Sequence, residues 1–288
     1  MESLCLIWIH GLYVIYFIKC FLMHAEITYK DRKIMSIYKN VVGHGKDIVL
    51  IHGWGCDHRH MAPIADMLTK NYRVTNIDLP GIGKSTWNSN IKNIHNFADI
   101  LLPHLPEQAI YIPWSFGGLV TISLAARHRS RVEKIIGITT SPKFIEDKNW
   151  PGVPLPGFKE IFSNMMRKIG FKAFFEGFYD SEFSDIDPKP ENYFKLKKML
   201  VNLPPEKLEI LLEGINICDT ADLRSEFQSL SCPIDFILGG KDESIPVASH
   251  EHIKQLNSNL NLHVILEAKH MPFWTHPKLF QEELKKCL

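Results

Sequence analysis

The stretch that most constrains the fold of this chain is an apolar strand that runs directly into a serine and leaves it as a helix. Residues 109–118 read Ala-Ile-Tyr-Ile-Pro-Trp-Ser-Phe-Gly-Gly, and an apolar helical pattern continues to about residue 128. Such a turn lifts the hydroxyl of Ser115 out of a sheet, where a base can reach Oγ and backbone N–H groups can face an oxyanion. The alternative is a serine that only caps the helix. Pro113 stands where the common Gly-x-Ser-x-Gly pattern has glycine, and proline is tolerated at the last residue of a strand.

Two later strand patterns each end beside a residue suited to activating a serine. The run 233–238 leads into a glycine-rich turn with Asp242, and the run 262–266 is followed by His270. We predict that His270 takes the proton of Ser115 as base, while Asp242 holds the imidazole tautomer and stabilises the imidazolium. The alternatives are a turn aspartate that caps backbone groups and a surface loop histidine.

A third strand pattern, 47–52, runs into the loop His52-Gly-Trp-Gly55. A loop of this kind supplies a backbone N–H beside the one that follows the nucleophile, so we predict an oxyanion hole formed by the amides of Trp54 and Phe116. The position of His52 before a glycine turn favours a role in bracing the loop over a role as base. Trp54 and Trp114 are expected to wall a substrate pocket, although aromatic residues near a turn are often plain core.

Strand-like and helical patterns alternate along the chain, which is typical of a mostly parallel sheet covered by helices on both faces. We predict strands at 26–30, 34–39, 47–52, 73–77, 109–113, 134–139, 233–238 and 262–266. Residues 149–221 differ, because a Pro/Gly-rich start is followed by three or four amphipathic helices, and we predict that they form a lid over the carboxyl ends of the strands. Most of its aromatic and methionine side chains are expected to form lid core, with Phe174 or Phe175 lining the pocket. This set comprises Phe158, Phe162, Met165, Met166, Phe171, Phe174, Phe175, Phe178 and Tyr179.

Composition limits the number of domains, the kinds of partner and the use of cysteine that this chain can have. A chain of 288 residues that is 45% hydrophobic can bury one sizeable core with a modest insertion. The 33 basic and 32 acidic residues give no overall field that favours nucleic acid. The six cysteines form no Cys-x-x-Cys pair and no zinc spacing, as expected for a protein of the reducing cytosol.

Three other features of the sequence are weaker candidates for a functional site. The run Gly83-Lys84-Ser85-Thr86 resembles the end of a phosphate-binding loop, but Asp78 stands where that motif needs its first glycine. His58 and His60 are interpreted as a loop pair, so that no metal is expected. Asp235 is a weaker candidate acid than Asp242 because it lies in mid-strand.

Seven segments, taken in order, carry a resemblance to one known family: His52-Gly-Trp-Gly55, Asp78-Leu-Pro-Gly-Ile-Gly-Lys-Ser85, Trp114-Ser-Phe-Gly-Gly118, Ser141-Pro142, Asn149-Trp-Pro-Gly152, Leu196-Lys-Lys198 and Thr220-Ala-Asp-Leu-Arg224. With these segments the chain from Met35 to Leu288 resembles the pimeloyl-acyl-carrier protein methyl ester carboxylesterases of biotin synthesis, within the α/β-hydrolase superfamily. The glycine-rich motifs occur across the superfamily. The Trp beside the nucleophile, Trp-Pro-Gly at the start of the lid and Asp-Leu-Arg at its end narrow the resemblance to this branch.

The resemblance implies an α/β-hydrolase core at 35–148 and 222–288, with the helical lid inserted at 149–221. It implies a serine carboxylesterase that releases methanol from the pimeloyl methyl ester, with Ser115, Asp242 and His270 as catalytic groups. Trp54, Trp114, Phe174 and Phe175 are expected to bind substrate, without any metal or organic cofactor. The alternatives are a general short-chain carboxylesterase or thioesterase, and a binding protein without catalysis.

The implied partner is an acyl-carrier protein, which is acidic and would dock on basic residues of the lid. We predict that Arg167, Lys168, Lys172, Lys195 and Lys198 receive it. Arg167 with Lys172, and Lys195 with Lys198, are expected to share helical faces. The alternative is that these are ordinary solvated positions.

The amino-terminal segment 1–34 contains an almost continuously apolar run at 4–23, long enough to span a membrane as a helix. It lacks the basic flank and the cleavage site of a secretory signal. Three interpretations stay open: an upstream extension, a membrane anchor, or a segment that packs on the domain. We expect a cytoplasmic monomer, or a catalytic domain that faces the cytoplasm if the run inserts.

Overall fold

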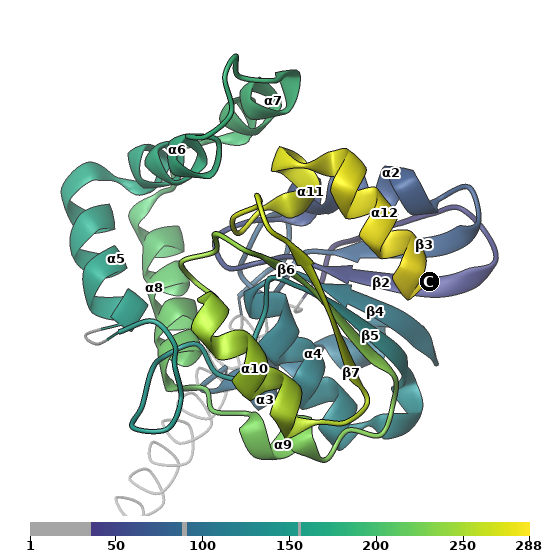
Figure 1. The fold of residues 1–288 in the computed structure, drawn as a ribbon. Coiled ribbons are helices and arrows are strands. Elements are labelled where there is room, and N and C mark those ends of the chain that lie inside the picture. Colours follow the sequence, from purple (N-terminus) through teal and green to yellow (C-terminus); the bar gives the residue numbers. More distant parts are fainter. Residues whose placement is uncertain (1–35, 88–90, 155–156) are drawn as a thin grey trace, which may run out of the picture. The chain divides into compact units, whose positions relative to one another are not determined.

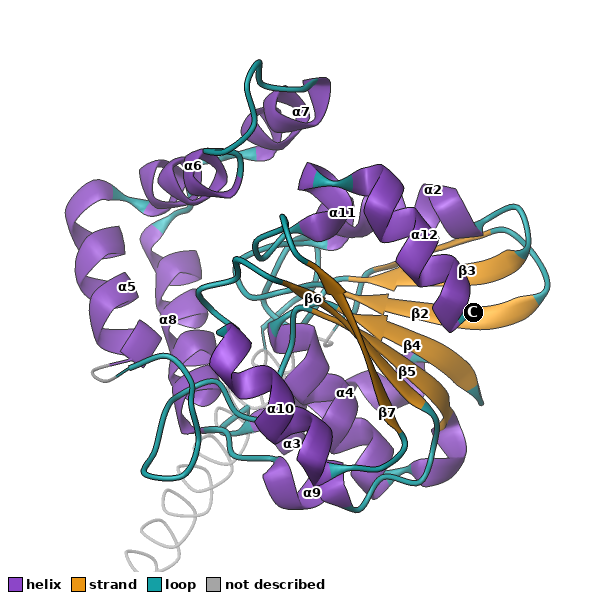
Figure 2. Ribbon diagram, viewed as in Figure 1, coloured by secondary structure: helices purple, strands orange, loops and turns teal. Residues whose placement is uncertain are grey.

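A seven-stranded sheet forms the centre of the protein. The computed structural model describes residues 36–87, 91–154 and 157–288, of which Ile37–Leu288 form one compact unit. The strand order is β1-β3-β2-β4-β5-β6-β7, and only β1 runs antiparallel to its neighbour (Figure 2). The strands are Lys39–Val42 (β1), Lys46–Ile51 (β2), Tyr72–Ile77 (β3), Ala109–Pro113 (β4), Val132–Ile138 (β5), Ile234–Gly239 (β6) and Leu260–Ile265 (β7).

The predicted strand at 34–39 is wrong for the residues that the structure describes. The strand begins only at Lys39. At Tyr38 the carbonyl still accepts the N–H of Asp78 (3.0 Å), but the N–H donates to the hydroxyl of Ser85, outside the ladder. The predicted strand at 26–30, the start of the 34–39 run and the whole segment 1–34 lie outside the described residues.

The central strands are apolar because helices cover both of their faces. Every residue of β4 and β6 is buried, and both strands are rich in isoleucine, which suits a buried parallel strand. The edge strand β1 is exposed throughout. Burial therefore increases from the edge strand β1 to the strands β4 and β6. Ser115 and Asp242 follow the carboxyl ends of these two buried strands.

Helices cover the two faces of the sheet (Figure 1). One face carries α2, α11 and α12, and the other carries α3, α4, α9 and α10. Their bounds are Ala62–Leu68 (α2), Ile94–Leu101 (α3), Phe116–Arg127 (α4), Arg224–Gln228 (α9), Val247–Leu256 (α10), Pro272–Thr275 (α11) and Pro277–Cys287 (α12). The first ten residues of α4 are buried, so this helix is apolar on all sides.

Between β5 and α9 the described chain forms four further helices: Gly157–Ile169 (α5), Phe171–Glu182 (α6), Glu191–Met199 (α7) and Pro205–Thr220 (α8). We call α5–α8 the lid helices. Within them α5 packs on α8 and α6, and α7 reaches back to contact α11. The amide of Asn192 donates a hydrogen bond of 3.2 Å to the carbonyl of Trp274 at this contact.

One predicted feature of the lid is wrong. Arg167 and Lys172 do not share a helical face, because α5 ends at Ile169 and α6 begins at Phe171. Gly170 between them has φ +84°, a left-handed conformation that favours glycine and breaks the helix. Lys195 and Lys198 do lie on one helix, α7. In the described part of the chain, no helix is both long and apolar enough to cross a membrane.

Candidate active site

Ser115 lies at the turn between β4 and α4 in a strained conformation. Its φ is 53° and its ψ is −121°, a region that residues other than glycine rarely adopt. The N–H of Trp114 donates to Ile51 on β2 (2.9 Å), and the N–H of Ser115 donates to Ile138 on β5 (3.0 Å). Pro113 is the last residue of β4, so the two residues after it still tie the turn to both neighbouring strands.

Close packing explains the glycine after the serine. A Cβ at Gly117 would lie 2.5 Å from the carbonyl oxygen of Ile51, well inside van der Waals contact. The absence of a side chain therefore lets the first turn of α4 approach β2. This approach fixes where the turn carries the hydroxyl of Ser115.

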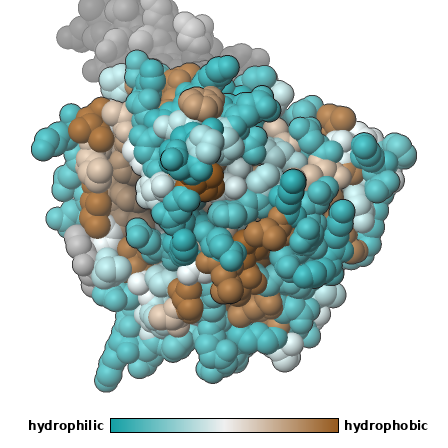
Figure 3. All heavy atoms as spheres, turned by 45° about the horizontal axis from the view of Figure 1, so that its top comes forward, coloured by the Kyte–Doolittle hydropathy of each residue, from teal (hydrophilic) through white to brown (hydrophobic). Residues whose placement is uncertain are grey.

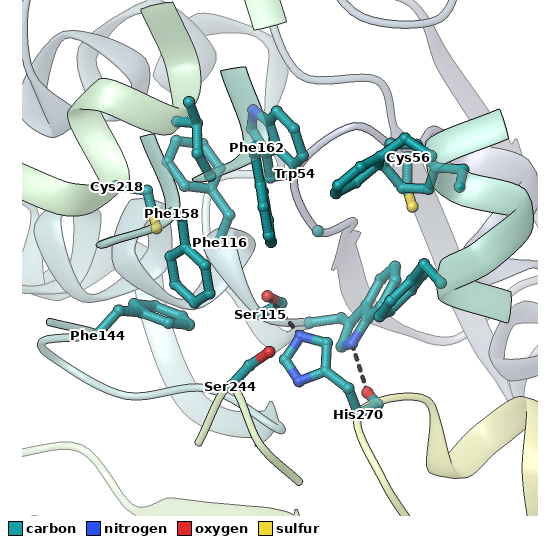
Figure 4. Close-up of a pocket in the computed structure, with 16 residues that line it drawn as sticks. Trp54, Cys56, Ser115, Phe116, Phe144, Phe158, Phe162, Cys218, Ser244 and His270 are labelled. Atoms are coloured by element: carbon teal, nitrogen blue, oxygen red, sulfur yellow. Dashed lines mark hydrogen bonds between the residues drawn. The ribbon is translucent and has the colours of Figure 1, made fainter. Parts of the chain in front are cut away.

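Three side chains that follow different strands meet in one hydrogen-bonded chain. Nε2 of His270 lies 2.8 Å from Oγ of Ser115, and Nδ1 of His270 lies 2.8 Å from Oδ2 of Asp242 (Figure 4 shows the first contact). A carboxylate only accepts, so Nδ1–H donates to Asp242 and Nε2 is left to accept the hydroxyl proton. The other oxygen of Asp242 accepts the N–H groups of Ser244 (2.8 Å) and Ile245 (3.1 Å), which fixes the carboxylate.

The charge state of His270 follows from its surroundings. Burial opposes protonation of the imidazole, but the Asp242 carboxylate outweighs it, and the pKa of His270 is raised above its ordinary value. The pair therefore stabilises the imidazolium that forms when Ser115 gives up its proton.

The backbone of His270 is held from three directions. Its carbonyl accepts the hydroxyl of Thr139 (2.8 Å) and the indole N–H of Trp114 (2.9 Å). The next N–H, of Met271, donates to Oε2 of Glu182 at the end of α6 (2.8 Å). Burial raises the pKa of Glu182 to about 7. Sequence reasoning missed Thr139 and Glu182, because neither lies in a motif and both contacts join distant parts of the chain.

The predicted oxyanion amides lie beside Ser115. Phe116 is the first residue of α4, and a Cβ at Gly53, next to Trp54, would lie 3.2 Å from Cβ of Ser115. Neither the N–H of Trp54 nor that of Phe116 has a hydrogen-bond acceptor among the described residues. Both donors are therefore available to a charge that develops next to Oγ.

His52 braces this loop. Its Nε2 accepts the N–H of Leu79 (2.9 Å), so the imidazole is neutral and its Nδ1–H donates to the carbonyl of Gly53 (2.8 Å). Burial lowers the pKa of His52, in agreement with the neutral form. The side chain has no free nitrogen with which to act as a base.

An apolar cavity of about 80 Å³ opens above Ser115 (Figure 4). Its lining residues are Gly53, Trp54, Cys56, Trp114, Ser115, Phe116, Phe144, Phe158, Phe162, Phe174, Phe175, Phe178, Ile215, Cys218, Ser244 and His270. All four predicted substrate-binding side chains are among them. Phe174 and Phe175, one or the other of which was expected to line the pocket, both do so. The expectation that the other aromatic side chains of the lid form only its core is wrong for Phe158, Phe162 and Phe178, because α5 and α6 turn these rings toward Ser115.

Two groups of side chains have donor atoms close enough to surround a cation, but their carboxylates are already engaged. In the group Asp57, His58 and Asp78, Asp57 accepts two hydrogen bonds from Arg59. In the group Asp235, His263 and Cys287, Asp235 pairs with Lys134 at 2.8 Å. These ion pairs satisfy the carboxylates without a metal. The ion pair with Lys134 offsets the cost of burying the Asp235 carboxylate.

The basic residues predicted to receive a carrier are exposed on the lid helices. Arg167 pairs with Glu209 (3.2 Å), and Lys195 pairs with Glu191 on its own helix (3.1 Å). Lys168 and Lys172 flank Gly170 at the junction of α5 and α6. Figure 3 shows apolar side chains gathered in several patches on a mostly hydrophilic face of the molecule. On α5 the exposed apolar residues are Ile161, Met165 and Ile169.

Comparison with known proteins agrees with this geometry. The profile of the alpha/beta hydrolase fold family matches residues 47–277. The chain therefore belongs to the α/β-hydrolase family. The pimeloyl-acyl-carrier protein methyl ester esterase from Pseudoalteromonas atlantica is 31% identical over 254 residues, with 86% of this chain and 96% of the relative covered. The esterase of the same name from Legionella pneumophila strain Corby is 32% identical, with 85% and 96% covered. Within the α/β-hydrolase family, the chain therefore belongs with these esterases.

Solved structures share the fold. The bromoperoxidase from Bacillus anthracis superposes with a TM-score of 0.76 at 22% identity, covering 89% of this chain and 96% of the other. The enol-lactonase from Burkholderia xenovorans LB400 superposes with a TM-score of 0.73 at 19% identity, covering 88% and 96%. At 19% and 22% identity, these structural similarities are evidence for a shared fold only.

Proposed function

We propose that the protein is a serine carboxylesterase that hydrolyses pimeloyl-acyl-carrier protein methyl ester to methanol and the carrier-bound acid, a step of biotin synthesis. The single observation that carries the chemistry is the hydrogen-bonded chain from Ser115 through His270 to Asp242. The proposed substrate is taken from the relatives, which are named as esterases of this methyl ester and match 86% and 85% of this chain.

The reaction runs through an acyl-enzyme. Oγ of Ser115 attacks the ester carbonyl while Nε2 of His270 takes its proton, and the tetrahedral oxyanion accepts the N–H groups of Trp54 and Phe116. The bond to the methoxy group then breaks, and His270 returns the proton to release methanol. Water, deprotonated by His270, hydrolyses the acyl-enzyme by the same route and frees Ser115.

The cavity lining favours an uncharged ester over the acid product. Apart from His270, none of its lining side chains carries a charge, and nine of them are phenylalanine or tryptophan. Methylene groups and a methyl ester lose little on entering such a site, whereas a carboxylate must give up its hydration without a partner. We therefore expect the carrier-bound substrate to bind and the newly formed carboxylate to leave.

Two features support the partner and the compartment that we propose. The exposed basic residues Arg167, Lys168 and Lys172 at the α5–α6 junction offer positive charge to an acidic carrier. Four described cysteines are free thiols, which suits the reducing cytoplasm: Cys56, Cys218, Cys232 and Cys287.

Product analysis on the carrier-bound methyl ester tests this function. The purified protein is incubated with it, and the intact carrier is weighed by mass spectrometry. We expect the loss of one methyl group with the thioester to the carrier intact. Release of unacylated carrier would instead establish the thioesterase alternative, and turnover of a free short ester without turnover of the carrier-bound one would establish a general esterase.

A further inference from the structure

The carboxyl end of α6 contacts both loops that carry the proposed acid and base. The ammonium of Lys269 donates to the carbonyl of Ser181 (2.8 Å) and to the hydroxyl of Ser184 (2.6 Å). Next to it, the N–H of Met271 donates to Glu182. On the other loop, Lys241 pairs with Asp185 at 2.8 Å. The residues on either side of His270 and the residue before Asp242 are therefore tied to one turn of the lid.

Glu182 is the buried member of this contact. The residue is 7% exposed, and no lysine or arginine in the described part of the chain pairs with its carboxylate. Its polar neighbours are the backbone N–H of Met271, 2.8 Å from Oε2, and the backbone N–H of His270. The charged groups that face it are His270 and Asp242.

Such a carboxyl is costly to bury. A carboxylate without a basic partner loses hydration that an amide hydrogen bond replaces only in part. The raised pKa of Glu182 reflects this cost. The amide that donates to it at 2.8 Å belongs to Met271, directly after the histidine that must reach Ser115.

We propose that Glu182 is a positioning residue, whose side-chain oxygen holds the backbone at His270 and Met271 so that Nε2 stays within reach of the Ser115 hydroxyl. This inference rests on the proposed role of His270 as base. Because Glu182 is the last residue of α6, the catalytic geometry depends on the lid helices lying over the sheet. A displacement of about 1 Å at a catalytic group lowers turnover by roughly 100-fold, so a small relaxation of this loop is enough to be measured.

The test compares two substitutions of nearly equal shape, Glu182→Gln and Glu182→Met. Glutamine keeps an oxygen that accepts the amide hydrogens, and methionine does not. With p-nitrophenyl butyrate as substrate, we expect kcat to fall at least 10-fold in Glu182→Met, with KM changed less than about twofold, and to stay within about threefold of wild type in Glu182→Gln. Glu176→Met, on the same helix with a half-exposed side chain, is the matched control and should keep wild-type kcat.

A second measurement reports on position without turnover. The Nδ1–H proton of His270 should keep its low-field NMR signal in Glu182→Gln and lose or shift it in Glu182→Met. If Glu182→Met does not fold, Lys269→Met removes the neighbouring contact without burying an unpaired group, and we expect kcat to fall about three- to tenfold. Wild-type kcat in Glu182→Met, or equal losses with glutamine and methionine, overturns the proposal.

The outcomes separate this inference from the proposed function. If Ser115→Ala is inactive while Glu182→Met and Lys269→Met keep wild-type kcat, only the positioning role falls. If Ser115→Ala retains activity, the proposed mechanism falls and the positioning role with it.

Discussion

At the scale of single residues, the site depends on local signals that a sequence carries and on contacts that it does not. Ser115, Asp242 and His270 could be proposed because each lies in the loop or turn after a strand that an apolar run predicts, and parallel strands end at one edge. Glu182 could not, because its contact with Met271 spans 89 positions and depends on how α6 lies over the sheet. Local patterns predict which residues lie at the carboxyl edge of the sheet. Tertiary packing decides which side chains hold the backbone of these residues in position.

The raised pKa of His270 gives a prediction for pH dependence. The base must be neutral to accept the proton of Ser115, so kcat/KM rises with pH through the pKa of His270 in the free enzyme. Asp242 raises that pKa, and we expect the midpoint of the acid limb above 6.5. A profile of kcat/KM from pH 5 to 9 with a small ester measures it. A midpoint at or below 6.5 would show that the Asp242 carboxylate does not act on His270 as the geometry requires.

Pro113 gives a second prediction at this scale. In Pro113→Gly we expect kcat/KM to be kept or raised, because glycine relieves crowding beside the turn that carries Ser115. The thermal midpoint should fall modestly, since glycine gives the unfolded chain more freedom. Steady-state kinetics and a thermal melt measure both quantities. Complete inactivation of a folded variant would mean that the proline itself holds the turn in place.

At the scale of elements, the lid helices show where sequence patterns stop being sufficient. Three or four amphipathic helices were predicted from composition and periodicity, but the partner of each apolar face was not. The aromatic rings of α5 and α6 line the cavity because the chain breaks into two helices at Gly170. The prediction that Arg167 and Lys172 share a helical face was wrong because it assumed one continuous helix through that glycine. The amphipathic period alone cannot tell a ring that packs within the lid from one that faces Ser115.

The α5–α6 junction yields a prediction for carrier recognition. Reversing Arg167, Lys168 and Lys172 to Glu should raise KM for the carrier-bound ester, more so at low salt, because an acidic carrier would meet like charge. Hydrolysis of a small free ester should not change. Kinetics with both substrates at two salt concentrations measure this.

The matched control reverses three exposed lysines elsewhere in the unit, Lys70, Lys278 and Lys285, and so changes the net charge equally. If the control raises KM as much as the junction variant, or if neither does, the carrier does not dock at the junction.

At the scale of the whole molecule, all proposed catalytic and cavity residues lie in the compact unit Ile37–Leu288. The fold class was predictable because alternating strand and helix patterns, joined to the serine turn, fit few architectures. The first strand was misplaced because an edge strand that is exposed throughout carries little apolar signal, and because the N–H of Tyr38, just before β1, donates to the Ser85 hydroxyl instead of to a strand.

A chain that begins at Met35 should therefore keep ester hydrolysis at the wild-type rate. Its kcat on a small ester and its melting midpoint are compared with those of the full chain. Loss of activity or aggregation would show that residues 1–34 contribute to the folded domain. Fractionation of cells that express the full chain separates a membrane anchor from an extension.

The most direct test of the account is methanol release from pimeloyl-acyl-carrier protein methyl ester by the wild-type protein and by Ser115→Ala. We expect turnover by the wild type and a loss on the order of 10⁴-fold or more in the variant, with the melting midpoint unchanged, because the acyl-enzyme route to product needs the nucleophile. Near wild-type methanol release by Ser115→Ala would contradict it.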